Sequence, residues 1–272
     1  MSLTPNSTSA HASKTPTVHL EWVDDGTIAI LTLDDPERAN AMSPQMGDAF
    51  KQHVHEIVVS DTVRTVIVRG AGKDFSIGGH RDMLISLGDP ARSEKDLHDF
   101  MMAFYLRWLP ILDVPVPVIV AMQGDCIGVA PVFACVADIA IADETLNLQV
   151  TFASLGFYPG MALPELLKRR VGPYHALRLC ATNEALTGRQ AEQIGLIDKC
   201  VPDGRAFDSA LETARKITAS AKSVVRLLKK NLGVEKGTLS SELELNASQQ
   251  AKDFHTEEYR ERVANYLPNH YV

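Results

Sequence analysis

The stretch KDFSIGGHR at Lys73–Arg81 decides the fold when it is read together with VIVAMQGDCIGVAPVF at Val118–Phe133. The first combines a strand end, two glycines and a polar helix start. The second combines a buried strand, a tight turn at Gln123–Gly124 and a helix start made of small residues. Each predicts free backbone N–H groups at the N-terminus of a helix, where the helix dipole favours negative charge. Two such ends facing each other would form an oxyanion hole, able to stabilise an enolate at a thioester carbonyl. Either stretch alone is more often an ordinary turn.

The composition is that of an ordinary globular protein, and it narrows the classes of function. The 272 residues are 45% hydrophobic and 22% charged, which suits a packed core. A formal net charge of −7 argues against a nucleic-acid-binding protein, because no broad basic excess is available for phosphates. The four cysteines form no CxxC pair and are expected to form neither disulfides nor a metal site. No secretory pattern and no apolar run of membrane-spanning length is found, so we expect a cytoplasmic protein.

The pattern along the chain predicts three parts. Residues 1–17 are rich in Ser, Thr, Pro and Asn and are expected to be a disordered tail. Residues 18–202 alternate apolar strands with helical patterns, which predicts an α/β core that begins with a hairpin around Asp24–Gly26. From Pro159 onward the pattern is mostly helical, and residues 203–272 are expected to form a helical oligomerisation region.

Several ordered blocks of the sequence resemble one known family. Besides the two stretches above, they are DDPERANAMSPQM at Asp34–Met46, ADIAIADETLNLQVTFASLGFYPGM at Ala137–Met161 and LTGRQAEQIGLIDKCVP at Leu186–Pro202. In this order they resemble the crotonase (enoyl-CoA hydratase/isomerase) superfamily. The resemblance implies an α/β fold, a crotonase spiral of ββα turns, followed by a C-terminal helical region that forms trimers or hexamers. It says less about the reaction, because one fold hosts many chemistries.

The resemblance also implies where a thioester would bind. The amides of Ile77 and Val129 would hold its oxygen, beside the two glycines Gly78 and Gly79. The loop that resembles the family's pantetheine- and nucleotide-binding loop contains Arg38, Ala39 and Ala41. The substrate would then be carried on CoA or on the phosphopantetheine of an acyl carrier protein, with no separate cofactor and no metal.

The clearest departure from the family concerns its acids. Hydratases of this family place and activate water with two glutamates, and those positions fall on Val132 and Phe152 here. Neither side chain transfers a proton, so water addition by the usual mechanism is not expected. A dry pocket with an oxyanion hole suits decarboxylation instead, because a carboxylate that loses its solvation releases CO₂ and leaves a stabilised enolate.

One branch of the family combines these features. The run FYPGM at Phe157–Met161 resembles the crotonases of polyketide β-branching, which decarboxylate a 3-methylglutaconyl group on acyl carrier protein. That branch uses a lysine after the first oxyanion stretch and a histidine on the late helix. Here Lys95 is a poorly placed candidate, Gln250 stands at the histidine's position, and His255 follows about one turn later.

Two residues are the candidates for proton transfer. Tyr158 lies in the loop before Pro159, where a phenol would donate a proton or orient a carboxylate; otherwise it is an ordinary loop aromatic. His80 follows the glycines at a helix start, where it is either an active-site group or a surface cap. Basic clusters would meet CoA phosphates or an acidic carrier, or are solvated helix faces: Lys168–Arg170, Arg226 and Lys229–Lys230.

Three functions remain open from the residues alone. The first is a carrier-bound or CoA-bound decarboxylase of β-branching. The second is an enoyl-CoA isomerase or lyase of acyl-CoA catabolism, with Tyr158 or His80 moving the proton. The third is a crotonase-like binding subunit without catalysis, which the loss of both glutamates allows.

Overall fold

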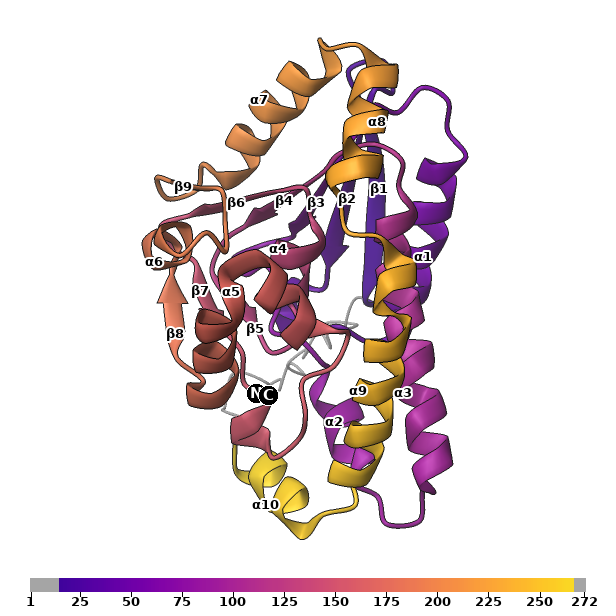
Figure 1. Ribbon diagram of the computed structural model, residues 1–272, viewed down its shortest axis with the longest axis vertical. Coiled ribbons are helices and arrows are strands. Elements are labelled where there is room, and N and C mark those ends of the chain that lie inside the picture. Colours follow the sequence, from indigo (N-terminus) through magenta and orange to yellow (C-terminus); the bar gives the residue numbers. More distant parts are fainter. Residues whose placement is uncertain (1–14, 267–272) are drawn as a thin grey trace, which may run out of the picture.

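The structure is a computed structural model that describes residues 15–266 (Figure 1). The predicted tail therefore lies almost wholly outside the described residues. Its predicted end is too late, because Thr17 is already the first residue of strand β1 (Thr17–Val23). Strand β2 (Ile28–Asp34) pairs antiparallel with β1, which confirms the hairpin. Its turn holds Asp24 and Asp25 with φ of 50° and 55°, a region that Asp tolerates better than most residues.

A six-stranded sheet forms the centre of the molecule, in the order β1-β2-β3-β4-β6-β9. Beyond the first hairpin its strands are parallel, and they are β3 (Thr65–Gly70), β4 (Val118–Met122), β6 (Ile139–Asp143) and β9 (Lys199–Val201). Parallel strands need cover on both faces, which explains the nearly continuous apolar run of β4. A second sheet has three short strands in the order β5-β7-β8: β5 (Asp125–Ile127), β7 (Asn147–Gln149) and β8 (Ala185–Thr187).

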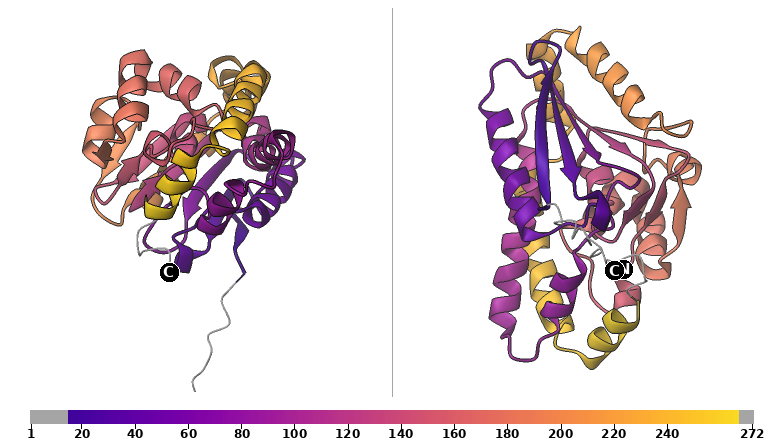
Figure 2. Two further views of the ribbon diagram at one scale, coloured as in Figure 1. Left: turned by 90° about the horizontal axis from the view of Figure 1, so that it is seen from below. Right: turned by 180° about the vertical axis from the view of Figure 1, so that it is seen from behind.

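Alternation along the strands sends side chains to two different cores. Ala29 and Leu31 face one core, shared with helices α1 (Pro44–Val58) and α3 (Glu94–Trp108). Ile28 and Ile30 face the other, which helix α7 (Ala206–Thr218) covers with its alanines on the opposite side of the sheet (Figure 2). Helix α7, which the sequence places in the helical C-terminal part, is thus a layer of the sheet core.

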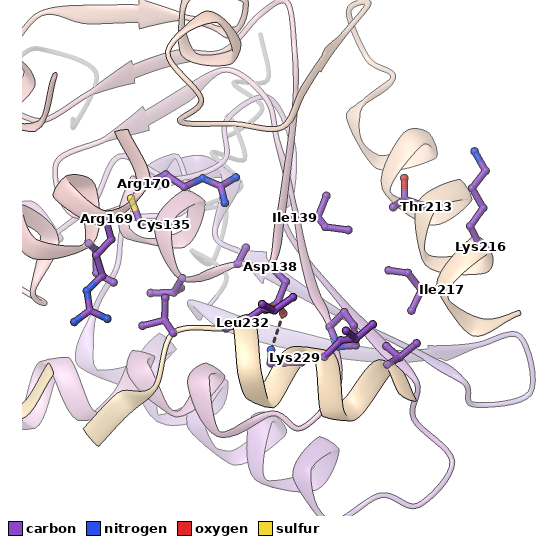
Figure 3. Close-up of a pocket in the computed structure, with 18 of the residues that line it drawn as sticks. Cys135, Asp138, Ile139, Arg169, Arg170, Thr213, Lys216, Ile217, Lys229 and Leu232 are labelled. Carbon is purple, nitrogen blue, oxygen red and sulfur yellow. Dashed lines mark hydrogen bonds and ion pairs between the residues drawn. The ribbon is translucent and has the colours of Figure 1, made fainter. Parts of the chain in front are cut away.

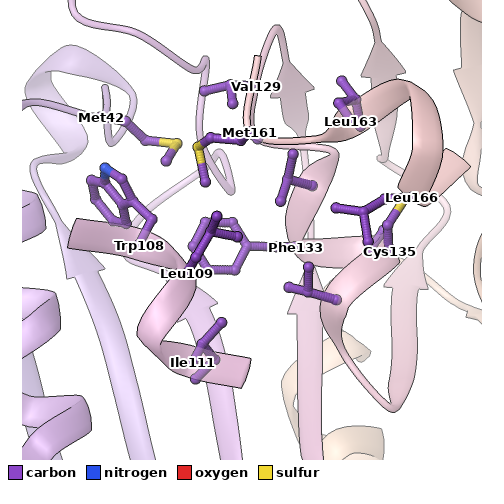
Figure 4. Packing of buried hydrophobic residues seen from close by; sticks show 14 of the residues in the cluster. Met42, Trp108, Leu109, Ile111, Val129, Phe133, Cys135, Met161, Leu163 and Leu166 are labelled. Carbon is purple, nitrogen blue, oxygen red and sulfur yellow. The ribbon is translucent and has the colours of Figure 1, made fainter. Parts of the chain in front are cut away.

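Short helices follow the two diagnostic stretches. Helix α2 (Arg81–Leu87) follows the first and helix α4 (Val132–Val136) follows the second. A 3₁₀ helix, η1 (Pro36–Arg38), begins the early loop, and η2 (Leu109–Asp113) extends α3. Within the larger core the Trp108 ring meets Phe133 edge-on, with ring centroids 6.1 Å apart (Figure 4).

The rest of the chain is mostly helical, as predicted, apart from the short strands β8 and β9. Helix α5 is kinked at Gly172, whose φ is 79°, and Pro173 follows it. The remaining elements are η3 (Ala153–Leu155), α5 (Leu163–Thr182), α6 (Gly188–Gln193), α8 (Lys222–Leu232), η4 (Lys236–Leu239), α9 (Ser240–Asp253) and α10 (Glu257–Tyr266).

The last helices return to the first ones. Helix α9 lies along α3, and α10 contacts α2 (Figure 1). The Tyr259 hydroxyl of α10 donates to the carbonyl of Leu84 in α2, at 2.6 Å. Helix α8 differs, because none of its residues is buried and Leu227 and Leu232 are exposed. Trimer formation through this region stays a prediction.

Candidate active site

The two diagnostic stretches lie side by side. Ser76 and Cys126 form an isolated parallel bridge, and the Ile127 amide donates to the Ser76 carbonyl at 2.9 Å. One register step earlier, the Phe75 amide donates to the Gln123 carbonyl at 2.8 Å. The turns that end the two stretches therefore face each other, at the ends of β3 and β4.

Glycine is required where the two turns touch. Gly78 has φ of 80°, and a Cβ added to it would lie 2.6 Å from the Ile127 carbonyl oxygen and 3.1 Å from the Val129 nitrogen. Gly128, on the other side, has φ of 66°. A side chain at Gly78 would be strained by its backbone conformation and would push the two turns apart.

Most amides of the two turns are already used. The Ile77 amide donates to the Ala39 carbonyl at 3.1 Å, and the His80 amide donates to the Met42 carbonyl at 3.0 Å. The Gly78 amide donates to Ser76 Oγ at 3.2 Å. In the second turn, the Gly128 amide donates to the carbonyl of Gln149, in the neighbouring strand β7.

Two amides remain. Over residues 15–266, those of Gly79 and Val129 have no hydrogen-bond acceptor. Both residues line one cavity, so together they form a pair of donors suited to a thioester oxygen. The Val129 amide is thus available for the predicted role, which stays a prediction. The Ile77 amide is not available, because it donates to the Ala39 carbonyl, and the free amide of the first turn is that of Gly79, two residues later.

Val129 serves this pair without its side chain. The side chain points into the large core, where Met42 and Met161 lie close by (Figure 4). Val129 as a whole is 7% exposed. Its side chain packs in the core, while its amide has no acceptor among the described residues.

Asn40 joins the early loop to the first turn. It is fully buried, and its Nδ2 donates to the carbonyls of Ala71 and Asp74, both at 2.8 Å. Its own carbonyl accepts from Ser76 Oγ at 2.8 Å. Asn40 thus holds the loop against the turn that presents the Gly79 amide.

The predicted pantetheine-binding residues lie in this loop. Ala39 has φ of 46° and supplies the carbonyl that takes the Ile77 amide, and Ala41 is buried. Arg38 Nε donates to Asp35 Oδ2 at 2.9 Å. The loop is therefore beside the donor pair, while its contact with a pantetheine arm stays a prediction.

The cavity before the two amides is small and apolar. Its volume is about 50 Å³, and it is closed by α2, α3 and α9. The apolar side chains around it include Met83, Leu87, Met101, Phe104, Phe152, Leu155, Phe157 and Phe254. Lining residues with a polar side chain are limited to Tyr105, Thr151 and Gln250 within the described chain. None of the three is a carboxylate, a histidine or a lysine.

Tyr105 and Gln250 form a buried pair at the cavity wall. Gln250 Nε2 donates to the Tyr158 carbonyl at 2.7 Å, and the Tyr105 hydroxyl donates to Gln250 Oε1 at 2.5 Å. The two side chains come from α3 and α9, and both residues are 1% exposed. Burial raises the pKa of Tyr105 far above its usual range, so the phenol keeps its proton.

Val132 and Phe152, the positions that the resemblance aligns with the hydratase glutamates, are apolar. Phe152 lines the cavity and packs edge-on against Phe157, with ring centroids 5.0 Å apart. Val132 is buried at the start of α4 and is not among the lining residues. No group of three or more His, Cys, Asp and Glu that could hold a metal exists in the described part of the chain.

The structure places neither predicted proton carrier in this cavity. The Tyr158 side chain is 37% exposed and lines a separate surface hollow with Leu245 and Gln249. His80 is the N-cap of α2, where its Nδ1 accepts from the Asp82 amide at 3.3 Å. Both predictions are therefore wrong in position. Partial burial raises the pKa of Tyr158, but Tyr158 is not among the residues that line the cavity.

The other candidates also lie elsewhere. Lys95 is exposed at the start of α3 and paired with Asp99. His255 follows α9 and does not line the cavity, although its Nε2 is buried without a partner among residues 15–266. Gln250 is thus the one residue of the predicted late-helix set that reaches the cavity.

Most of the basic clusters are neutralised locally. Lys168 and Arg169 both contact Glu165, and Arg170 contacts Asp198. Lys229 donates to Asp138 at 2.7 Å inside a groove of about 710 Å³ between α7 and α8 (Figure 3). This groove is larger than the cavity, but neither Gly79 nor Val129 lines it, so it is not the site of thioester chemistry.

Comparison with known proteins identifies the family of this chain. Residues 24–270 match the family model of enoyl-CoA hydratase/isomerase. The chain belongs to the enoyl-CoA hydratase/isomerase family. Over 252 residues it is 30% identical to the 1,2-epoxyphenylacetyl-CoA isomerase of Escherichia coli, covering 91% of this chain and 94% of that protein. The predicted crotonase superfamily is thereby confirmed.

Solved structures share the fold. An enoyl-CoA hydratase/isomerase from Mycobacterium paratuberculosis matches with a TM-score of 0.81 at 21% identity, covering 91% of this chain and 97% of its own. The decarboxylase domain of CurF from Lyngbya majuscula, solved as a variant, matches with a TM-score of 0.77 at 21% identity, covering 93% and 100%. These likenesses confirm the crotonase fold. In the described residues no helix is both long and apolar enough to cross a membrane.

Sequence reasoning missed two groups in the cavity. The Gly79 amide was overlooked in favour of Ile77, since the partner of each amide is set by residues far away in the chain. Tyr105, on α3, was not singled out from the sequence at all. A signal was present, because a phenol on a buried helix face needs a hydrogen-bond partner.

Proposed function

We propose that this protein decarboxylates a 3-methylglutaconyl-type thioester through an enolate held by the Gly79 and Val129 amides. The observation that carries the proposal is the content of the cavity: two free amide donors, and no lining side chain that would remove a proton. Such a site stabilises an enolate that it has no group to generate by deprotonation. Cleavage of a carbon–carbon bond forms the enolate without a base.

The reaction balances without a further reagent. The bond between the γ-carbon and the carboxylate breaks, and CO₂ leaves. The electron pair spreads through the conjugated system to the thioester oxygen, which the two amides stabilise. One proton is then taken up at carbon, giving a 3-methylcrotonyl-type thioester. The apolar walls favour the first step, because they replace the hydration of the departing carboxylate.

Cavity size supports a short acyl group. The cavity, of about 50 Å³, is narrow and is walled mostly by aromatic and aliphatic side chains. A long fatty acyl chain would have to displace the aromatic side chains around it. The decarboxylase domain of CurF, which shares the fold, is consistent with this chemistry. The acyl group would be carried on CoA or on an acyl carrier protein, and no other cofactor is needed.

The test is direct. The protein is incubated with 3-methylglutaconyl-CoA and with the same acyl group on a carrier protein, and loss of CO₂ is followed by mass spectrometry. We expect turnover with at least one carrier and negligible hydration of crotonyl-CoA. Hydration at an ordinary enzyme rate of about 1–10³ per second would show that a base had been recruited and would contradict the proposal.

Isomerisation of a CoA thioester is the second candidate. It is favoured by the 30% identity, over nearly the full length, to an isomerase that acts on 1,2-epoxyphenylacetyl-CoA. Opening of an epoxide needs an acid more than a base, and Tyr105 is an acid in the cavity. Conversion of that epoxide without any release of CO₂ from the glutaconyl thioesters would favour this candidate. Activity on neither would favour a binding subunit.

A further inference from the structure

Tyr105 is the only ionisable side chain among the cavity's lining residues in the described chain, and it is held in a defined state. The Tyr158 carbonyl accepts from Gln250 Nε2, which fixes the orientation of the Gln250 amide. Its oxygen must then face the phenol, so the phenol is the donor of their hydrogen bond. The pair therefore keeps Tyr105 neutral and its hydroxyl at the cavity wall.

The backbone at Gly160 packs closely against Tyr105 and Gln250. A Cβ added to Gly160 would lie 2.7 Å from the Tyr105 hydroxyl oxygen and 2.8 Å from Gln250 Nε2. The chain thus approaches as closely as a glycine allows. Burial raises the pKa of Tyr105, and the Met161 backbone acts in the opposite direction to a smaller extent.

We propose that Tyr105 is a further catalytic residue, the acid that delivers the proton to the dienolate, and that Gln250 is the residue that positions it. This inference rests on the proposed decarboxylation. After CO₂ leaves, the Tyr105 hydroxyl turns its proton from Gln250 Oε1 toward the dienolate. The O–H bond then breaks, the proton goes to the γ-carbon, and the electron pair stays on the phenolate oxygen. Water that enters as product leaves returns the proton. The amides hold the enolate oxygen, so cleavage does not depend on Tyr105.

The separation of the two steps provides the test. The enzyme is run in D₂O with the thioester on which wild type is active, and both CO₂ release and the position of deuterium in the product are measured. Wild type is expected to place deuterium at a single carbon. Tyr105→Phe should still release CO₂, while its products form a mixture in which some molecules carry deuterium at the α-carbon and others at the γ-carbon.

Tyr259→Phe is the matched control. Tyr259 is also fully buried and its hydroxyl donates to a backbone carbonyl, but it does not line the cavity. It should place deuterium as wild type does. A structural loss caused by removing a buried hydroxyl would move both variants, whereas the proposed role moves only Tyr105→Phe.

The outcomes separate the claims. CO₂ release with wild-type deuterium placement in Tyr105→Phe would overturn the role of Tyr105 and leave the proposed function standing. A folded Tyr105→Phe that releases no CO₂ would place Tyr105 before cleavage and overturn its assignment as the final acid. No CO₂ from wild type overturns both claims. If Tyr105→Phe does not fold, Gln250→Leu takes its place, and unchanged deuterium placement there counts against the proposal.

Discussion

The two turns that meet at the cavity offer their amides by different means. In the first turn, the amides on either side of Gly79 donate hydrogen bonds to the early loop and to a serine side chain, so only the Gly79 amide stays free. In the second, pairing with strand β7 takes the Gly128 amide, and Val129 has its side chain in the core. The first turn thus depends on a loop far away in the chain. The second depends on its own sheet and core.

The difference shows what selects an oxyanion donor. Both turns contain glycines with positive φ, but neither of those glycines is the donor, because their amides are used in place. The donor in each turn is the residue after the glycine. Whether an amide stays free depends on the hydrogen bonds that its neighbours make with distant segments, and not on the type of residue that carries it.

The largest expected effect on kcat comes from removing the N–H of Gly79. When Gly79 is replaced by the corresponding α-hydroxy acid, an ester oxygen takes the place of the N–H group. Loss of one such donor typically lowers kcat by about 10²–10³. The matched change at Ile77 should lower the melting temperature instead, because that amide bonds to the Ala39 carbonyl. Equal losses of kcat at both sites would return Ile77 to the mechanism.

Asn40 tests whether the first turn depends on the early loop. Asn40→Ala removes two side-chain donors from part-buried carbonyls and the acceptor of the buried Asp35 amide, and each unsatisfied buried group costs about 1–3 kcal/mol. We expect a fall of about 2–4 kcal/mol in the free energy of unfolding, measured in urea. Asn147→Ala is the control, because Asn147 is exposed and bonds only to Asp125 through its Nδ2. Loss of stability there equal to that of Asn40→Ala would contradict the comparison.

Val129→Ala separates the side chain from the amide in the second turn. Truncation removes buried methyl groups at about 0.8 kcal/mol each, so stability should fall by about 1–2 kcal/mol. The amide remains, and kcat should stay within about threefold of wild type. A drop in kcat beyond tenfold, with stability nearly unchanged, would mean that the side chain takes part in catalysis.

Stability at high pH sharpens the account of the cavity. Burial raises the pKa of both Tyr105 and Tyr259 above the ordinary value, so the folded state keeps protons that the unfolded state releases. The two tyrosines contribute their full stabilisation to the free energy of unfolding below about pH 10. Above it this contribution falls by up to about 1.4 kcal/mol per pH unit for each tyrosine. Thermal unfolding of wild type and Tyr105→Phe between pH 8 and 11 measures this. A wild-type melting temperature that does not fall faster than the variant's above pH 10 would argue against burial of the phenol.

Much of the fold could be predicted because its signals are local. The turn around Asp24–Gly26 predicted the first hairpin, and Ser43 with Pro44 begins α1 as helix-capping rules require. The strands β8 and β9 were missed because three residues carry too little pattern. The place of α7 on the sheet was also missed, since its covering alanines are small.

The turns that form the candidate site could be predicted from the sequence, but the polar groups that face its cavity could not. The sequence by itself determined the two glycine turns and the apolar residues at Val132 and Phe152, from which the loss of the hydratase acids was predicted. Only the tertiary structure decided that Gly79 rather than Ile77 offers its amide, and that Tyr105 rather than Tyr158 reaches the cavity. The physical reason is that strand, turn and helix propensities depend on neighbours in the chain. A free amide or a buried phenol depends on partners contributed by distant segments, here the early loop and α9.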